Sequence, residues 1–217
     1  MMSNRLVFLV EGDCEIWFIN HIIIPYLYRL PEATEYKWSM NAQKVTTNRH
    51  LNMKGGVINY QLVKNEIQRL ISQKNPWITT FFDCFRLPNS FPGFTQGYDA
   101  IEREIYNDIQ YDRLLPYLQK YEFEALLFTS PEEFSKLDID DKQYDQIISI
   151  SKQYPSVEDI NGGPDTAPSK RLQKIFHYVK TTDSKEVLKN VPIDVLMKRS
   201  PRFNNWIKSL EDIITRL

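Results

Sequence analysis

The sequence predicts an α/β protein with a largely parallel sheet flanked by helices and with a helical C-terminal region. Residues 6–10 (LVFLV) and 77–82 (WITTFF) are apolar runs of strand length, typical of strands buried on both faces. Helix-length apolar patterns alternate with these strands over the first 83 residues. Such alternation favours parallel pairing, with ligands bound at the carboxyl ends of the strands.

The segments between the two strands follow from local patterns. Apolar residues over 16–27 predict a helix, which Pro25 should kink or end. Residues 41–50 are polar but tolerate a strand, and the sequence Lys54-Gly55-Gly56 signals a turn. Helical spacing then predicts an amphipathic helix over about residues 57–73.

Beyond Asp83 the prolines and glycines mark shorter elements. We expect a loop over 85–98, a helix over about 99–109, a short strand within 114–121 and, over 122–128, a strand end passing into a helix.

The rest of the chain predicts short helices separated by prolines. Ser169 is a suitable N-cap for a helix over about 170–180, and an apolar stripe predicts a last helix that contains Trp206 and Leu210. We therefore expect an α/β core over 1–130 and a helical region over 131–217, packed together as one compact unit.

Composition excludes several classes of protein. The chain has 217 residues, of which 42% are hydrophobic and 25% charged, which argues against a disordered or fibrous protein. No apolar run approaches the ~18 residues of a membrane span, so we expect no membrane partner. Cys14 and Cys84 form neither a disulfide framework nor a zinc spacing. Without an export signal, we expect a cytoplasmic protein.

The net charge of −1 hides an asymmetry along the chain. Residues 1–167 have a balance of −7 and residues 168–217 a balance of +6. An acidic body with a basic C-terminal quarter fits a metal site beside a phosphate-binding surface. A solvated lysine-rich helix face explains the same numbers, and the charge by itself favours that simpler explanation.

Acidic side chains follow the first predicted strand. Glu11 stands at its end, Gly12 permits a tight turn, and Glu15 lies one helical turn further on. Both glutamates are therefore able to reach one cation. Alternatively, Asp13 and Glu15 simply favour the first turn of the following helix through its dipole.

A second acid ends the other strong strand. Asp83 follows Phe81-Phe82, so it should lie at the same edge of the sheet as Glu11. Clustered carboxylates repel one another unless a cation joins them, and a hard divalent ion is the natural partner. The alternative is an aspartate that starts a turn or caps the next segment.

Two more glutamates occur among apolar neighbours. Glu122 and Glu124 lie within the sequence YEFEALLF, and buried carboxylates in such company usually have a metal or basic partner. They are also compatible with a strand whose acidic residues alternate outward.

A glycine turn precedes the predicted helix at 170–180. Gly162 and Gly163 expose backbone N–H groups, and Lys170 and Arg171 occupy the first helical turn, where cations oppose the dipole. N–H groups and cations together favour a bound phosphate, and we expect both cations to face the acidic residues across a cleft. A plain loop with a solvated basic face is the alternative.

A strand followed by Glu-Gly-x-x-Glu, and a later strand ending in Asp, resembles the Toprim domain of topoisomerases, primases and overcoming-lysogenization-defect nucleases. Five segments in order resemble, more narrowly, a Toprim-like bacterial family of uncharacterised proteins, often encoded beside an AAA/ABC-type ATPase in defence-type operons. They span about residues 6–211 and read LVEGDCE, FFDCFRLP with FPG, YLQKYEFEALLF, INGGPDTAPSKRL and PRFNNWIKSLE.

The resemblance implies roles for individual residues. Glu11 matches the Toprim glutamate, Asp83 the first acid of the Asp-x-Asp motif, and Glu15 the second glutamate of the nuclease branch. The second acid of Asp-x-Asp is absent, because position 85 is Phe. This departure puts a full set of two-metal ligands in doubt, and Glu122 or Glu124 would have to replace the missing carboxylate.

The sequence therefore predicts a Mg²⁺- or Mn²⁺-dependent nuclease that cleaves phosphodiester bonds in DNA or RNA. Its catalytic residues would be Glu11, Asp83 and Glu15, with Glu122 or Glu124 as further metal ligands. The resemblance implies an effector of a bacterial phage-defence system that works with an AAA/ABC-type ATPase. The alternative is a non-catalytic binding or regulatory subunit of an ATPase complex. A homo-oligomer is compatible with either.

Overall fold

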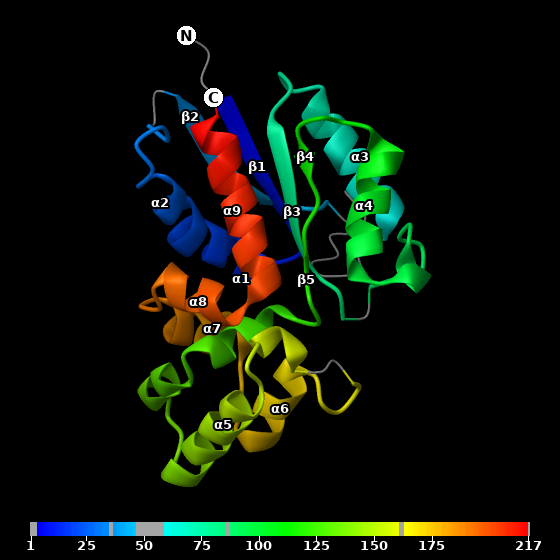
Figure 1. Ribbon diagram of the computed structural model, residues 1–217. Helices are drawn as coiled ribbons and strands as arrows, with labels where there is room; N and C mark the ends of the chain where they lie inside the picture. The colour runs from blue at the N-terminus through cyan, green and yellow to red at the C-terminus, as the bar shows by residue number, and fades with distance from the viewer. Residues whose placement is uncertain (1–3, 35–36, 47–58, 86, 161–162, 217) are drawn as a thin grey trace.

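The two strands predicted from apolar runs lie side by side at the centre of a parallel sheet in the computed structural model (Figure 1). The structure describes residues 4–34, 37–46, 59–85, 87–160 and 163–216. The predicted turn at 54–56 falls outside these ranges.

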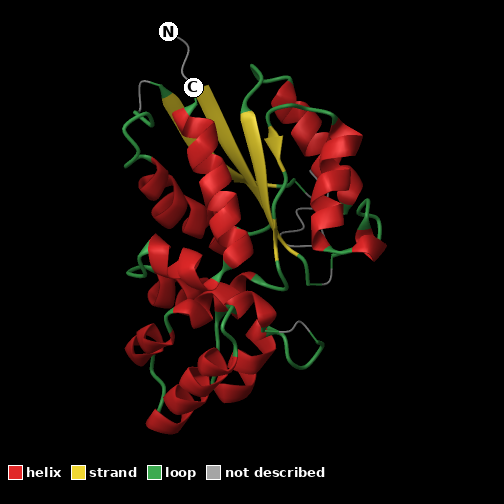
Figure 2. Ribbon diagram, in the orientation of Figure 1, coloured by secondary structure: helices red, strands yellow, loops and turns green. Residues whose placement is uncertain are grey.

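The sheet has the strand order β2-β1-β3-β4, with β5 also paired to β3, and every described pairing is parallel. Helices cover both of its faces, so the predicted α/β class is confirmed (Figure 2). The strands are β1 (Asn4–Val10), β2 (Trp38–Lys44), β3 (Trp77–Asp83), β4 (Leu114–Leu115) and β5 (Leu118–Gln119).

Helices make up most of the remaining described chain. The α-helices are α1 (Asp13–Phe18), α2 (Ile24–Leu27), α3 (Tyr60–Ile71), α4 (Tyr98–Ile109), α5 (Asp141–Gln153), α6 (Pro168–Ile175), α7 (Lys180–Leu188), α8 (Ile193–Arg199) and α9 (Pro201–Thr215). The π-helix is η1 (Ile19–Ile23), and the 3₁₀ helices are η2 (Phe94–Gln96), η3 (Phe123–Thr129), η4 (Pro131–Lys136) and η5 (Val157–Asp159).

Alternating side chains of the central strands fill two separate cores. Phe8 and Phe81 point into the core beneath α1, α2 and α9, whereas Leu9 and Phe82 point into the core beneath α3 and α4. All four are fully buried. This burial on both faces explains why the strand sequences are continuous apolar runs and do not alternate with polar residues.

The C-terminal helix α9 belongs to the covering of the sheet and not to a separate unit. Its Trp206 ring stacks on Tyr117 at a centroid distance of 4.6 Å and contacts Phe8 and Phe81 at 6.1 and 5.3 Å. Trp206 Nε1 also donates a 2.8 Å hydrogen bond to Thr79 Oγ1. The helical region over 131–217 therefore shares its core with the sheet.

Several local predictions differ in part from the structure. Pro25 does not end the helix, which continues to Leu27, because a π turn (η1) precedes the proline and changes the hydrogen-bond pattern where the ring would clash. The strand expected within 114–121 is split into β4 and β5. Glu122 is extended, as expected of a strand end, and the helix that follows it is the 3₁₀ helix η3. The helix expected over 170–180 ends at Ile175, and a new helix begins at Lys180.

The carboxyl ends of β1 and β3 face the helical region. Helix α1 begins three residues after β1 and packs against α7 (Figure 1). The predicted acids thus lie between the sheet edge and helices from the C-terminal part of the chain. Among the described helices, none combines the length and the apolar character needed to cross a bilayer.

Candidate functional site

Glu11 and Asp83 lie side by side at the edge of the sheet, as the sequence predicts. Parallel pairing aligns Val10 of β1 with Phe81 of β3, so the residues after each strand are neighbours. The backbone N–H of Asp83 donates a 3.1 Å hydrogen bond to Glu11 Oε1. The two acids are therefore linked directly by the register of the sheet.

Glu15 joins them from the first turn of α1. Its side chain is only 6% exposed, although a glutamate at a helix start usually faces water. A Cβ atom at Gly12 would lie 2.8 Å from Glu15 Oε2, so the missing side chain at Gly12 leaves room for this carboxylate. The Glu-Gly-x-x-Glu pattern thus places two carboxylates on the same side of one tight turn.

Glu124 comes from η3 and completes the group. Asp83 Oδ1 accepts a 2.7 Å hydrogen bond from the backbone N–H of Phe123, which fixes η3 against the end of β3. The Glu124 side chain is 4% exposed. We call Glu11, Glu15, Asp83 and Glu124 the acid cluster.

A lysine that the sequence analysis missed lies among these carboxylates. Lys180 Nζ is 3.0 Å from Glu15 Oε1, 3.4 Å from Glu124 Oε2 and 3.7 Å from Asp83 Oδ2. It also lies 5.4 Å from the centroid of the Phe123 ring. An ammonium group therefore neutralises part of the acid cluster in this structure.

Lys180 is the first residue of α7, where a cation opposes the helix dipole. The same unfavourable placement is what singles out Lys170 and Arg171 in the sequence. Lys180 is not singled out in this way, because the helix predicted over 170–180 places it at a helix end and not at a helix start.

Burial and charge shift the pKa values of the cluster. Burial raises the pKa of Asp83 and of Glu124, and the positive charge of Lys180 only partly offsets this. For Lys180 burial lowers the pKa, but the charges of Asp83, Glu124 and Glu15 outweigh burial and raise the pKa well above its ordinary value. Lys180 is therefore a permanent cation at neutral pH.

Glu11 differs from the other acids, because no ion pair to it is formed among the described residues. Burial, assisted by the negative charge of Glu15, raises its pKa to about 7. Its carboxyl group therefore exchanges a proton near neutral pH, as a general acid or base must.

The donor chemistry of the cluster suits a hard divalent cation, because carboxylate oxygens are the ligands that Mg²⁺ and Mn²⁺ prefer. Within the described ranges, however, no three acidic, histidine or cysteine side chains are spaced as ligands around a common point. The Lys180 ammonium takes the central position, and it holds Glu15, Asp83 and Glu124 around itself.

Tyr178 supplies an unsatisfied polar atom beside the cluster. Its hydroxyl is buried without a hydrogen-bond partner among the described residues, and the residue is 7% exposed. Burial and the charge of Glu124 raise the pKa of Tyr178, so its hydroxyl lies within electrostatic range of the acids. A buried hydroxyl without a partner is costly, and a ligand or a water at this point would satisfy it.

The carboxylate of Glu122, which the sequence predicts as a metal ligand, accepts hydrogen bonds from another part of the chain in this structure. Its two carboxylate oxygens accept 2.8 and 2.9 Å hydrogen bonds from the backbone N–H and the hydroxyl of Ser169. Ser169 lies in the first turn of α6. Glu122 therefore accepts hydrogen bonds at the N-terminus of α6 and places a negative charge there. This is the position at which the sequence predicts a bound phosphate.

Within the part of the chain that the structure describes, Lys170 and Arg171 form no ion pair with the acid cluster, whose cationic partner is Lys180. Lys170 Nζ donates to Gln173 Oε1 at 3.0 Å on the surface of α6, and Arg171 donates to the carbonyl of Thr166 and to the hydroxyl of Tyr154. Gly162 lies outside the described residues. At Gly163 a Cβ would lie 2.6 Å from Thr166 Oγ1, so this glycine makes room for a tight turn.

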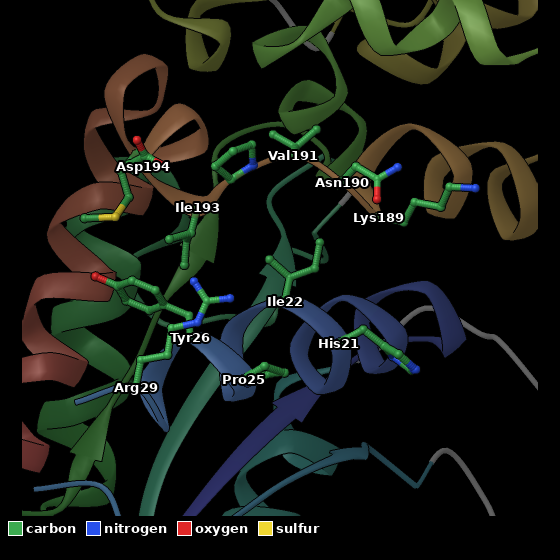
Figure 3. A pocket seen from close by; sticks show the side chains of 12 residues that line it. His21, Ile22, Pro25, Tyr26, Arg29, Lys189, Asn190, Val191, Ile193 and Asp194 are labelled. Atoms are coloured by element: carbon green, nitrogen blue, oxygen red, sulfur yellow. The ribbon is translucent and has the colours of Figure 1, made fainter. Parts of the chain in front are cut away.

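A cavity of about 580 Å³ lies away from the acid cluster, between η1–α2 and the segment that leads from α7 into α8. Figure 3 shows Tyr26 and Arg29 on one side of it and Val191 and Ile193 on the other. Asp194 is the acid among its lining residues. This cavity lacks the convergence of carboxylates, and the acid cluster remains the stronger candidate for chemistry.

A family model described as a domain of unknown function (DUF4276) matches residues 10–211, so the chain belongs to that family. The match begins at the end of β1 and ends in α9, and it includes every residue of the acid cluster and Lys180. Neither a curated protein nor a solved structure matches the chain significantly.

Replacing Lys180 by Met should destabilise the protein in a pH-dependent way. The change leaves three buried carboxylates without their cation, and the 35% exposure of the Lys180 side chain moderates the loss. We expect the free energy of unfolding to fall by about 1–3 kcal/mol at about pH 8, and by less at about pH 5, because the raised pKa values of Asp83 and Glu124 favour their neutral forms at the lower pH. Urea unfolding followed by circular dichroism measures this. The exposed Lys208→Met should change the free energy by less than ~0.5 kcal/mol at both pH values; equal losses for the two variants would contradict the ion-pair assignment.

Glu11 should make the protein less stable as the pH rises. Its pKa is raised to about 7 in the folded state, so its contribution is fully present below the ordinary value of 4.5 and is lost as the pH rises through about 7. Glu11→Gln should remove this loss and increase the unfolding free energy at about pH 8 by on the order of 2 kcal/mol. Thermal unfolding in EDTA across this pH range tests the expectation, and a variant no more stable than the wild type at pH 8 would refute it.

Proposed function

We propose that this protein is a Mg²⁺- or Mn²⁺-dependent nuclease that cleaves phosphodiester bonds in DNA or RNA at the acid cluster. One observation supports this most strongly: the carboxyl groups of Glu11, which follows β1, and of residues in α1, β3 and η3 converge at the carboxyl edge of a parallel sheet. Ligands of such sheets usually bind at this edge.

The charge of the cluster supports a divalent partner. Four carboxyl groups gather around a single ammonium group, so the acids of the cluster outnumber the cation among them. Deprotonation of Glu11 near neutral pH adds a negative charge to the acid cluster. A divalent cation would compensate this charge, and the hydroxyl of Tyr178 is a buried polar atom that a bound ion or its water would satisfy.

Glu11, Asp83, Glu15 and Glu124 are the residues that would hold the metal, with Glu124 in place of the acid missing at Phe85. When bound, the metal lowers the pKa of water and neutralises negative charge on a phosphodiester.

The chain itself supplies a further group. Lys180 is a compact cation on a flexible stem, and it neutralises a phosphate oxygen when the acids release it.

A non-catalytic binding or regulatory subunit is the second candidate. The ion pairs of Lys180 favour it, because they stabilise the acid cluster without any metal. Phe85 favours it as well, since it stands where the Toprim motif has an acid. An AAA/ABC-type ATPase partner and a place in phage defence are part of both proposals, and they rest on the sequence resemblance.

Cleavage by acid-cluster variants separates the two candidates. We expect the wild type to cleave plasmid DNA or total RNA in Mg²⁺ or Mn²⁺, and Glu11→Gln and Asp83→Asn to lose at least ~100-fold of that activity. Each change keeps the shape of the side chain and removes its charge. Gel electrophoresis with the purified protein, with and without an ATPase partner, measures the rates.

The matched control is Glu104→Gln on the outside of α4, where the glutamate pairs with Arg103. This variant should cleave like the wild type. Full activity in Glu11→Gln would remove the acid cluster from the mechanism. Absence of cleavage by the wild type on both substrates, with either metal and with the ATPase present, would favour the non-catalytic subunit.

A further inference from the structure

Three aromatic residues lie at the carboxyl edge of the sheet, next to the acid cluster. They are Phe85, Tyr98 and Tyr121, and we call them the aromatic ledge. Each is half-buried, so part of its surface stays open to solvent. The rings of Tyr98 and Tyr121 meet edge to face, with their centroids 6.0 Å apart.

Backbone hydrogen bonds tie the ledge to the acids. The N–H of Phe85 donates to the carbonyl of Tyr121 at 2.6 Å, and two residues away the N–H of Phe123 donates to Asp83 Oδ1 at 2.7 Å. The segments 83–85 and 121–123 therefore run alongside each other. The backbone of Phe85 and Tyr121 is therefore adjacent to the segment that carries Asp83.

Tyr121 has an unusual backbone conformation. Its φ of +63° lies in the left-handed region, which bulky L-residues rarely adopt and which glycine adopts without strain. Strained residues of this kind persist only where their surroundings hold them, and they gather at functional sites. Glycine would adopt this backbone conformation without strain. The presence of tyrosine therefore indicates that the phenol ring is useful at this position.

Cations flank the two tyrosines. Lys120 Nζ lies 5.5 Å from the centroid of the Tyr121 ring, and the Arg202 guanidinium lies 6.0 Å from the Tyr98 ring. Lys120 also forms an ion pair with Asp159. Arg202 also forms ion pairs with Asp99 and Glu102. Aromatic rings with cations beside them are the usual surface for unstacked bases and the phosphates that join them.

We propose that the substrate of the acid cluster is single-stranded nucleic acid, with a base stacked on the aromatic ledge while its phosphodiester lies at the carboxylates. In a duplex the neighbouring bases cover both faces of each base, so no face is free to stack on Tyr121 or Tyr98. The position of the phosphodiester rests on the proposed function, whereas the stacking of a base does not.

Equilibrium binding of labelled oligonucleotides tests the inference on the full-length protein. Fluorescence anisotropy in EDTA compares oligothymidylate, oligouridylate and a DNA duplex of equal length. We expect both single strands to bind more tightly than the duplex. Tyr121→Ala should weaken single-strand binding by about 5- to 100-fold, as expected for one lost base stack, and Tyr121→Phe should keep the affinity within about twofold. Tyr106→Ala, an exposed tyrosine on α4, is the matched control and should bind like the wild type.

The outcomes separate this inference from the proposed function. Unchanged single-strand affinity in a folded Tyr121→Ala, or a duplex bound as tightly as the single strands, would overturn it. Selective single-strand binding that depends on Tyr121 supports it even if no preparation cleaves nucleic acid, because that result would contradict only the catalytic proposal. A preference for oligothymidylate or oligouridylate would identify DNA or RNA as the strand.

Discussion

The ammonium group of Lys180 and the carboxylates of Glu15, Asp83 and Glu124 hold the functional edge of this protein together. Each acid comes from a different element, and the lysine comes from the start of α7. Cys14 and Ser184 donate hydrogen bonds to the carbonyl of Lys180, so the position of this residue is fixed through its backbone as well. The helical region is thereby connected to the sheet by charge in addition to the apolar core. Because Glu15 and Glu124 are buried, removal of the Lys180 ammonium would leave their carboxylates without a compensating charge.

The same arrangement concentrates carboxyl groups at one edge of the sheet. The parallel register of β1 and β3 brings Glu11 beside Asp83, and η3 adds Glu124 against the end of β3. A proton on Glu11, the ammonium of Lys180 and a divalent ion all reduce the same negative charge. They therefore compete, and an arriving metal would free Lys180 to meet an anionic substrate. The aromatic ledge lies beside this edge, so in our proposal the metal, Lys180 and a stacked base would all act at the same edge of the sheet.

The sequence predicted those parts of the fold and site that depend on local patterns. Apolar runs identified β1 and β3, and an acid after each strand identified Glu11 and Asp83, because parallel strands bring their carboxyl ends to one edge. Glu122 could not be separated from Glu124 by sequence, since both lie among apolar residues and only the position of α6 shows that Glu122 meets Ser169. Lys180 lies 56 residues beyond Glu124, and nothing in its own neighbourhood distinguishes it from Lys170. The contacts of Lys180 with the acids depend on where α6 ends and α7 begins, and on packing between distant parts of the chain. The periodicity of apolar residues in the sequence indicates neither.

The most direct test of this account is to compare the position of the Lys180 side chain in crystals without metal and in crystals soaked in metal. Crystals grown without divalent ions and soaked in Mn²⁺ at about pH 8, above the raised pKa of Glu11, give an anomalous difference map of the site. The account predicts a manganese peak bounded by carboxylate oxygens of Glu11 and Asp83, with Lys180 Nζ displaced from Glu15 and Glu124. A map without a peak, in which Lys180 keeps all three ion pairs at high Mn²⁺, would contradict it.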